Sequence, residues 1–120
     1  MEEQIRRGNA AMRTSIDEKT DVVHAMDHPA LGPIDFRHGE TGDPARDFRG
    51  GSGVAKIVAK HGEETAMKMP EVIVRGDVTH GQSRTFIDHG EHRAVLAKDF
   101  KGEPTNRWLV TGYEKKEGNR

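Results

Sequence analysis

The clearest hydrophobic pattern in the chain lies just after a glycine-rich stretch in its middle. Four side chains there recur at i, i+3, i+4 and i+7 and share one face of a helix: Val54, Ile57, Val58 and His61. Ser52 before them has the side chain of an N-cap, and Gly62 after them is typical of the residue that follows a helix. The pattern predicts a short helix whose last residue, His61, continues the stripe that faces the rest of the fold.

The first half of the chain carries a thinner apolar pattern. Helix formers dominate residues 1–26 and predict one or two weak helices, the second over residues 22–26 with Asp21 as its cap. That helix is expected to end at His28, because a residue before proline avoids the α region. Residues 34–36 predict a short extended piece. Residues 39–53, with five glycines, predict a long and mobile surface loop.

The second half favours helix first and strands afterwards. Residues 63–69 predict another helical turn, and residues 70–76 predict one more, although their β-branched run also fits a strand. Strands are predicted from Val78, over 84–88, over 93–98 and over 108–115, with a longer turn at 99–106. Consecutive strands joined by short turns form an antiparallel meander. We therefore expect an α+β fold, with helices first and a roughly four-stranded antiparallel sheet after them.

Side chains alternate along the last predicted strand, so its two faces can be assigned. Leu109, Thr111 and Tyr113 are predicted to point to one face, and Trp108 and Val110 to the other. The threonine and tyrosine hydroxyls then lie about 7 Å apart along the strand. They form either a polar pair on a solvated face or part of a site.

Length and composition limit the organisation of the chain. It has 120 residues, of which 32% are hydrophobic, and its mean hydropathy is -0.83. One domain is expected over residues 21–115, with a weakly ordered segment at 1–20 and a loose tail at 116–120. The net charge of -1 argues against broad non-specific nucleic-acid binding but not against a local basic groove. Cysteine is absent, which excludes thiolate chemistry, and no apolar run is long enough to span a membrane.

Four stretches, taken in order, resemble a known family: residues 25–39, residues 51–61, residues 93–95 and residues 108–114. They are similar to the phage-associated branch of the barnase–EndoU–colicin–RelE nuclease group, whose domains occur in prophage polypeptides and polymorphic toxins. The resemblance covers residues 21–115. It implies N-terminal helices packed on a four-stranded antiparallel sheet, and metal-independent cleavage of RNA, often tRNA. By this resemblance the catalytic residues are His61, Arg93, Thr111 and Tyr113, with Lys56 as a further candidate.

The chemistry of these residue types fits that expectation. Cleavage of RNA without a metal needs a base for the ribose 2′-hydroxyl, an acid for the leaving oxygen, and donors for the phosphate. His61 can exchange a proton near neutral pH, and Arg93 can bind phosphate oxygens with two hydrogen bonds. Thr111 and Tyr113 can donate to the phosphate, and Tyr113 can alternatively stack on a base. RNA is thus the expected partner, with no cofactor, no metal and no membrane. A toxin-type domain also implies a cognate immunity protein, and the cytoplasm as the place of action.

Two other readings of the chain stay open. His24 and His28 are four residues apart and could bind a metal if one helix carried both, but the glutamate of the usual zinc signature is replaced by Ala25. The second alternative is a non-catalytic module that binds RNA or protein and keeps the same fold. The net negative charge favours this alternative.

Overall fold

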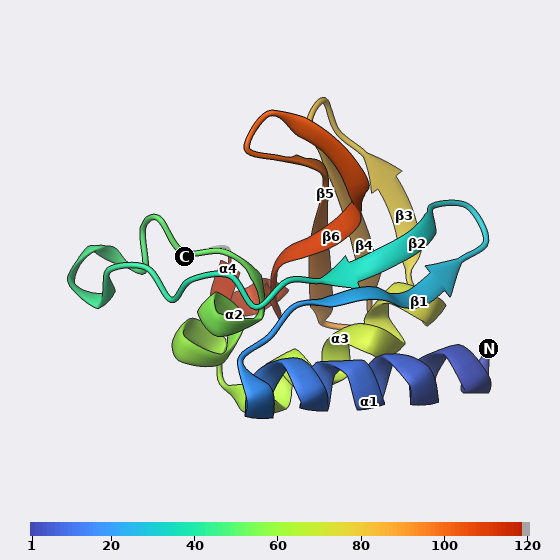
Figure 1. Ribbon diagram of the computed structural model, residues 1–120, viewed down its shortest axis with the longest axis horizontal. Helices are drawn as coiled ribbons and strands as arrows, with labels where there is room; N and C mark the ends of the chain where they lie inside the picture. Colours follow the sequence, from blue (N-terminus) through green and yellow to red (C-terminus); the bar gives the residue numbers. More distant parts are fainter. Residues whose placement is uncertain (119–120) are drawn as a thin grey trace.

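A six-stranded mixed sheet forms the centre of the molecule, with its strands in the order β1-β2-β6-β5-β4-β3 (Figure 1). The computed structural model describes residues 1–118. In chain order the elements are α1 (Glu2–Glu18), β1 (Val22–His28), β2 (Gly32–Phe36), η1 (Pro44–Arg46), α2 (Gly53–His61), α3 (Glu63–Arg75), β3 (Asp77–His80), β4 (Arg84–His89), β5 (His92–Phe100), β6 (Glu103–Glu114) and α4 (Lys115–Gly118). Neighbouring strands are antiparallel except β2 and β6, which run parallel.

The core lies between one face of the sheet and the helices α1 and α3, which run beneath it in Figure 1. α2 sits to the side, against β6 (Figure 1). Fully buried side chains come from every layer: Met12 in α1, Met26 in β1, Phe36 in β2, Ile57 in α2, Met69 and Ile73 in α3, Ile87 in β4, Leu96 in β5 and Leu109 in β6. The predicted α2 is therefore confirmed, with Val54 and Ile57 on its buried face.

The prediction of four antiparallel strands was wrong in number and direction, and the error lies in residues 22–28. These residues form β1 rather than a short helix, and Asp21 caps no helix. β1 pairs with β2, the extended piece predicted at 34–36, and β2 then joins the sheet through parallel contacts of Ile34 with Arg107 and Asp35 with Trp108. The predicted order of helices first and strands second fails for the same reason, because a hairpin stands between α1 and α2.

The other boundaries differ less. The stretch 63–76 forms one helix, α3, with Pro70 inside it, so the helical interpretation of residues 70–76 is confirmed. The turn predicted over 99–106 is only two residues long, because Lys101 and Gly102 both adopt positive φ and close a tight hairpin between Phe100 and Glu103.

Both ends of the chain, for which the sequence predicts weak order, contain helical residues in the structure. α1 is one continuous helix that buries Gly8, Ala11, Met12 and Ser15, while the weak order predicted for residues 1–20 stays a prediction about solution behaviour. The predicted loose tail starts as one helical turn, α4, and its remainder at 119–120 lies outside the described residues. No helix within the described part of the chain has both the length and the apolar character needed to cross a membrane.

Candidate active site

The backbone at the end of β2 holds the start of α2 and so positions His61. Ser52 occupies the N-cap position but makes no side-chain cap hydrogen bond. The first helical N–H groups are satisfied by carbonyls just after β2 instead, because Val54 N donates to Arg37 O at 3.0 Å and Ala55 N donates to His38 O at 2.8 Å. At the other end Gly62 N donates to Val58 O at 3.0 Å, with Gly62 at φ 95. His61 is thus presented from a helix fixed at both ends by main-chain hydrogen bonds.

A β-bulge in β6 decides which side chains share the face of the sheet turned away from the core. Val95 pairs with Thr111 while Leu96 pairs with Leu109, which leaves Val110 as an extra residue in β6. Leu109 therefore faces the core, and Trp108 falls on the same face as Thr111 and Tyr113. The predicted common face of Thr111 and Tyr113 agrees with the register, but the sides predicted for Leu109 and Trp108 were wrong, because simple alternation does not survive a bulge.

Gly112, between the threonine and the tyrosine, lies against the helices. A Cβ atom there would stand 2.1 Å from Sδ of Met69, so this position holds β6 tightly on α3. The close approach of strand and helix fixes the backbone that carries the neighbouring hydroxyl side chains.

Three of the expected residues are directly linked by the structure. The rings of His61 and Tyr113 are 5.9 Å apart between centroids and tilted by 38°. Arg93 lies directly opposite Tyr113 in the β5–β6 pairing, and Thr111 is the next residue of β6 on that face. Oγ1 of Thr111 is buried and has no hydrogen-bond partner within residues 1–118. A histidine, a guanidinium and two hydroxyl side chains therefore gather where α2 meets β5 and β6.

Arg93 is held by a carboxylate that sequence reasoning missed. Its Nε and Nη2 donate to Oδ1 and Oδ2 of Asp88 at 2.7 and 3.1 Å, and its guanidinium carbon lies 5.1 Å from the ring centre of Phe86. The hydrogen bonds to Asp88 hold the pKa of Arg93 above its ordinary value, with a further contribution from Tyr113. In return, Arg93 lowers the pKa of Asp88. The pair uses two of the five guanidinium donors and fixes the direction of the others.

Lys56 stands apart from this group. Burial lowers its pKa, nearby Lys60 lowers it further, and Asp47 of the long loop raises it. Lys60 itself donates to Asp47 at 3.0 Å. Within the described residues no hydrogen bond or ion pair is recorded between Lys56 and the other four candidates, and it is its neighbour Lys60 that pairs with the loop.

The alternative of a metal site required His24 and His28 to lie on one helix, and the structure places them on a strand instead. His24 and His28 lie on a strand, β1, and each has another partner: Nε2 of His24 is 2.6 Å from Oδ1 of Asp27, and Nδ1 of His28 accepts from Ala30 N at 3.0 Å. Within residues 1–118 no three histidine, aspartate or glutamate side chains are grouped as metal ligands.

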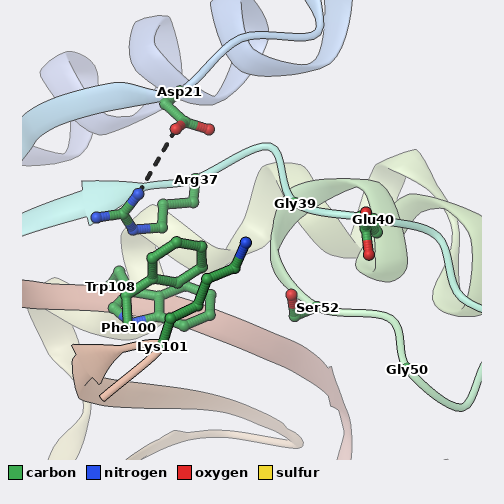
Figure 2. Close-up of a pocket in the computed structure, with 9 residues that line it drawn as sticks. All are labelled: Asp21, Arg37, Gly39, Glu40, Gly50, Ser52, Phe100, Lys101 and Trp108. Carbon is green, nitrogen blue, oxygen red and sulfur yellow. Dashed lines mark ion pairs between the residues drawn. The ribbon is translucent and has the colours of Figure 1, made fainter. Parts of the chain in front are cut away.

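A pocket of ≈ 350 Å³ opens beside the cluster, between the β5–β6 hairpin and the base of the glycine-rich loop (Figure 2). Trp108, from the face that carries Thr111, lines it together with Phe100, Lys101 and Arg37. Sequence reasoning assigned no role to these four side chains, because they are brought together only by the hairpin and by the parallel contact of β2 with β6.

An α+β domain that brings histidine, arginine, threonine and tyrosine side chains together beside a sheet has the groups expected of a small nuclease. The chain belongs to the phage-Barnase-EndoU-ColicinE5/D-RelE like nuclease 1 family, whose model matches residues 25–119. Comparison with curated proteins and with solved structures gave no significant match. The family agrees with the resemblance carried by the four sequence stretches, and it makes nuclease activity the expected class of function.

Proposed function

We propose that this protein is a metal-independent endoribonuclease that acts in the cytoplasm on tRNA or other single-stranded RNA. The ribose 2′-oxygen attacks the adjacent phosphorus, the bond from phosphorus to the 5′-oxygen breaks, and the products are a cyclic phosphate and a 5′-hydroxyl. The observation that carries the proposal is the convergence of His61 from α2 with Arg93 of β5 and Tyr113 of β6. These residues are far apart in the sequence, and their types match the needs of phosphate-ester cleavage.

Each residue has a distinct role in this mechanism. His61 moves a proton, either from the 2′-hydroxyl or to the leaving 5′-oxygen. Arg93 stays charged throughout, because Asp88 holds its pKa above the ordinary value, and its remaining donors face the phosphate charge that builds in the transition state. The hydroxyl of Thr111 has no partner within residues 1–118, and because it is buried it donates to a phosphate oxygen only after RNA binding moves the side chains that cover it. Tyr113 orients the phosphate or stacks on a base.

The test is single-turnover cleavage of total RNA in EDTA by purified variants. His61→Ala is expected to lower the rate by about 10²–10⁴-fold, the usual scale of acid–base catalysis. Thr111→Ala should lower the rate with little loss of RNA affinity, because its hydrogen bond matters most in the transition state. Arg93→Ala should lower both. Exposed His89, at the turn between β4 and β5, provides the matched control as His89→Ala.

Thermal melts accompany the rates, so that a folding defect is not taken for a catalytic one. A His61→Ala protein that folds normally and cuts RNA at the wild-type rate would exclude the proposed proton transfer. Activity that requires added zinc would contradict the metal-independent mechanism.

A non-catalytic RNA-binding or protein-binding module is the second candidate. The observation that favours it is the two-hydrogen-bond pairing of Arg93 with Asp88, which partly neutralises the cation that would hold the phosphate. On this alternative, RNA stays intact in the assay while binding persists and depends on Arg93. A cognate immunity protein stays a prediction for either candidate.

A further inference from the structure

We propose that the pocket beside the candidate active site is a nucleotide subsite, which takes one base of a single-stranded substrate with its phosphate and sets cleavage preference. The inference rests on the proposed nuclease function and adds a specificity site to it. Four side chains form the proposed subsite, and none of them belongs to the catalytic cluster. They are Arg37, Phe100, Lys101 and Trp108.

One wall of the pocket combines aromatic rings with cations. The rings of Phe100 and Trp108 meet edge to face, with centroids 5.5 Å apart. The guanidinium carbon of Arg37 lies 4.2 Å from the centre of the Phe100 ring and 5.8 Å from that of Trp108 (Figure 2). Nζ of Lys101 lies 5.3 Å from the Phe100 ring. Aromatic rings and arginine planes are the surfaces on which unpaired bases stack. Trp108 is only 6% exposed, so the Phe100 ring and the Arg37 plane offer the stacking surface, and the adjacent cations suit a phosphate.

Arg37 has donor capacity left for a ligand. Its Nε has no hydrogen-bond partner within residues 1–118 but is itself buried, so a ligand would meet the exposed part of the side chain, which is 22% accessible. The nearest oxygen recorded for its guanidinium is Oδ2 of Asp21, and that distance of 3.7 Å is longer than a hydrogen bond. A half-buried guanidinium with few hydrogen bonds gains from an added anion, which a nucleotide phosphate supplies.

The opposite wall comes from the glycine-rich loop and includes the side chain of Glu40, so that Glu40 and Asp21 line the pocket together with the two cations. Gly39 and Ser52 line it, and the hydrogen bonds Glu40 N to Ser52 O at 3.0 Å and Ser52 N to Glu40 O at 2.9 Å tie the two sides of the loop together. A Cβ atom at Gly39 would lie 2.0 Å from Ser52 O, so only glycine allows this approach. The resulting space of ≈ 350 Å³ falls within the range of about 300–1,000 Å³ typical of small-ligand pockets.

The position of the pocket connects it to the cluster. Trp108 and Thr111 share one face of β6, and their partners Ala97 and Val95 are two residues apart in β5, which corresponds to about 7 Å along the strand. An extended single strand of one or two nucleotides spans that distance. A substrate whose scissile phosphate lies at Thr111 and Arg93 therefore places a neighbouring nucleotide in the pocket.

Trp108 is the only tryptophan in the chain, so its fluorescence reports on the surroundings of this one residue of the pocket wall. The probes are tetranucleotides of each base with 2′-O-methyl riboses, which cannot undergo 2′-oxygen attack, and the corresponding 2′-deoxy tetranucleotides. We expect a saturable change in fluorescence with at least one base. Phe100→Leu and Lys101→Met should each weaken that binding by about 5-fold or more. Lys98→Met is the matched control, because Lys98 lies outside the pocket in a hollow with His80 and Arg107.

The possible outcomes test the nucleotide subsite and the nuclease activity independently. Equal binding of ribose and deoxyribose probes supports a site that reads base and phosphate, and stronger binding of the ribose-type probes supports an RNA subsite. If the protein binds the probes but cuts no RNA, the result supports the subsite and contradicts the proposed nuclease function. If RNA is cut normally but the probes cause no saturable change in fluorescence, the subsite alone is contradicted. The same holds if the Phe100→Leu and Lys101→Met proteins bind the probes as well as Lys98→Met does.

Discussion

At the scale of single residues, local hydrogen bonds decide what each titratable side chain can do. His28 illustrates this outside the candidate active site, where its Nδ1 accepts a hydrogen bond from the backbone of Ala30 at 3.0 Å. Burial lowers the pKa of His28, and the nearby charge of Arg107 lowers it further. Both the acceptor role and the pKa shift favour the neutral imidazole in the folded protein.

His28 therefore makes folding sensitive to mild acid. Its pKa in the folded state lies below the unfolded value of 6.5, so the unfolded chain binds the proton first and stability falls as pH drops through that window. His28→Asn keeps an acceptor for Ala30 N without the titration. We expect its melting temperature to match wild type at about pH 7.5 and to fall less by about pH 5. Parallel losses of wild type and His28→Asn over this range would contradict the assignment.

At the scale of elements, the junction between the glycine-rich loop and α2 is the critical part. The loop base closes with little space, since added Cβ atoms at Gly39 and Gly53 would meet backbone oxygens at 2.0 and 2.5 Å. The same closure aligns α2 with the end of β2. The mobility predicted for residues 39–53 stays a prediction, and main-chain hydrogen bonds occur both at the base of the loop, between Glu40 and Ser52, and in its outer part, between Asp43 and Arg49.

The variants Gly39→Ala and Gly50→Ala distinguish the cost of close backbone packing from the cost of a positive φ. Both glycines have positive φ, but nothing lies within 4 Å of a Cβ at Gly50. Gly50→Ala should cost about 1–2 kcal/mol of stability through φ alone. Gly39→Ala should cost clearly more and also slow RNA cleavage, because the start of α2 has to move. Thermal melts and single-turnover rates measure the two effects, and equal losses for both variants would show that close packing at Gly39 has no special role.

At the scale of the whole molecule, α1 lies outside the matched family region at 25–119 but completes the core. Met12 is fully buried, and a Cβ at Gly8 would stand 2.8 Å from Cβ of Pro70 in α3. Arg7 also donates to the His24 carbonyl at 2.7 Å, where β1 departs from regular pairing. The helix thus covers apolar surface that the rest of the domain cannot cover alone.

We expect Met12→Ala to lower the free energy of unfolding by about 2–5 kcal/mol, the usual cost of a large-to-small change in a core. Arg6→Ala, on the exposed side of the same helix, should change it by less than about 0.5 kcal/mol. Urea unfolding followed by circular dichroism gives both values. A loss for Met12→Ala no larger than that for Arg6→Ala would support the weak order that the sequence predicts for residues 1–20.

The sequence by itself determined the features that depend on neighbouring residues. The i, i+3, i+4 periodicity placed α2 and its terminal His61, and the turn residues at Gly81 and Gly90 separated β3, β4 and β5. These predictions succeed because helical periodicity and turn conformation depend on backbone preferences within a few residues.

Only the tertiary structure decided features that join distant segments. The β1–β2 hairpin gained strand form by pairing with β6, and the Val110 bulge moved Trp108 to the face of Thr111. The pocket of Arg37, Phe100 and Trp108 likewise needs three strands in register. These strand pairings depend on the apolar surface that is buried over the whole sheet. A short window of sequence does not contain that information.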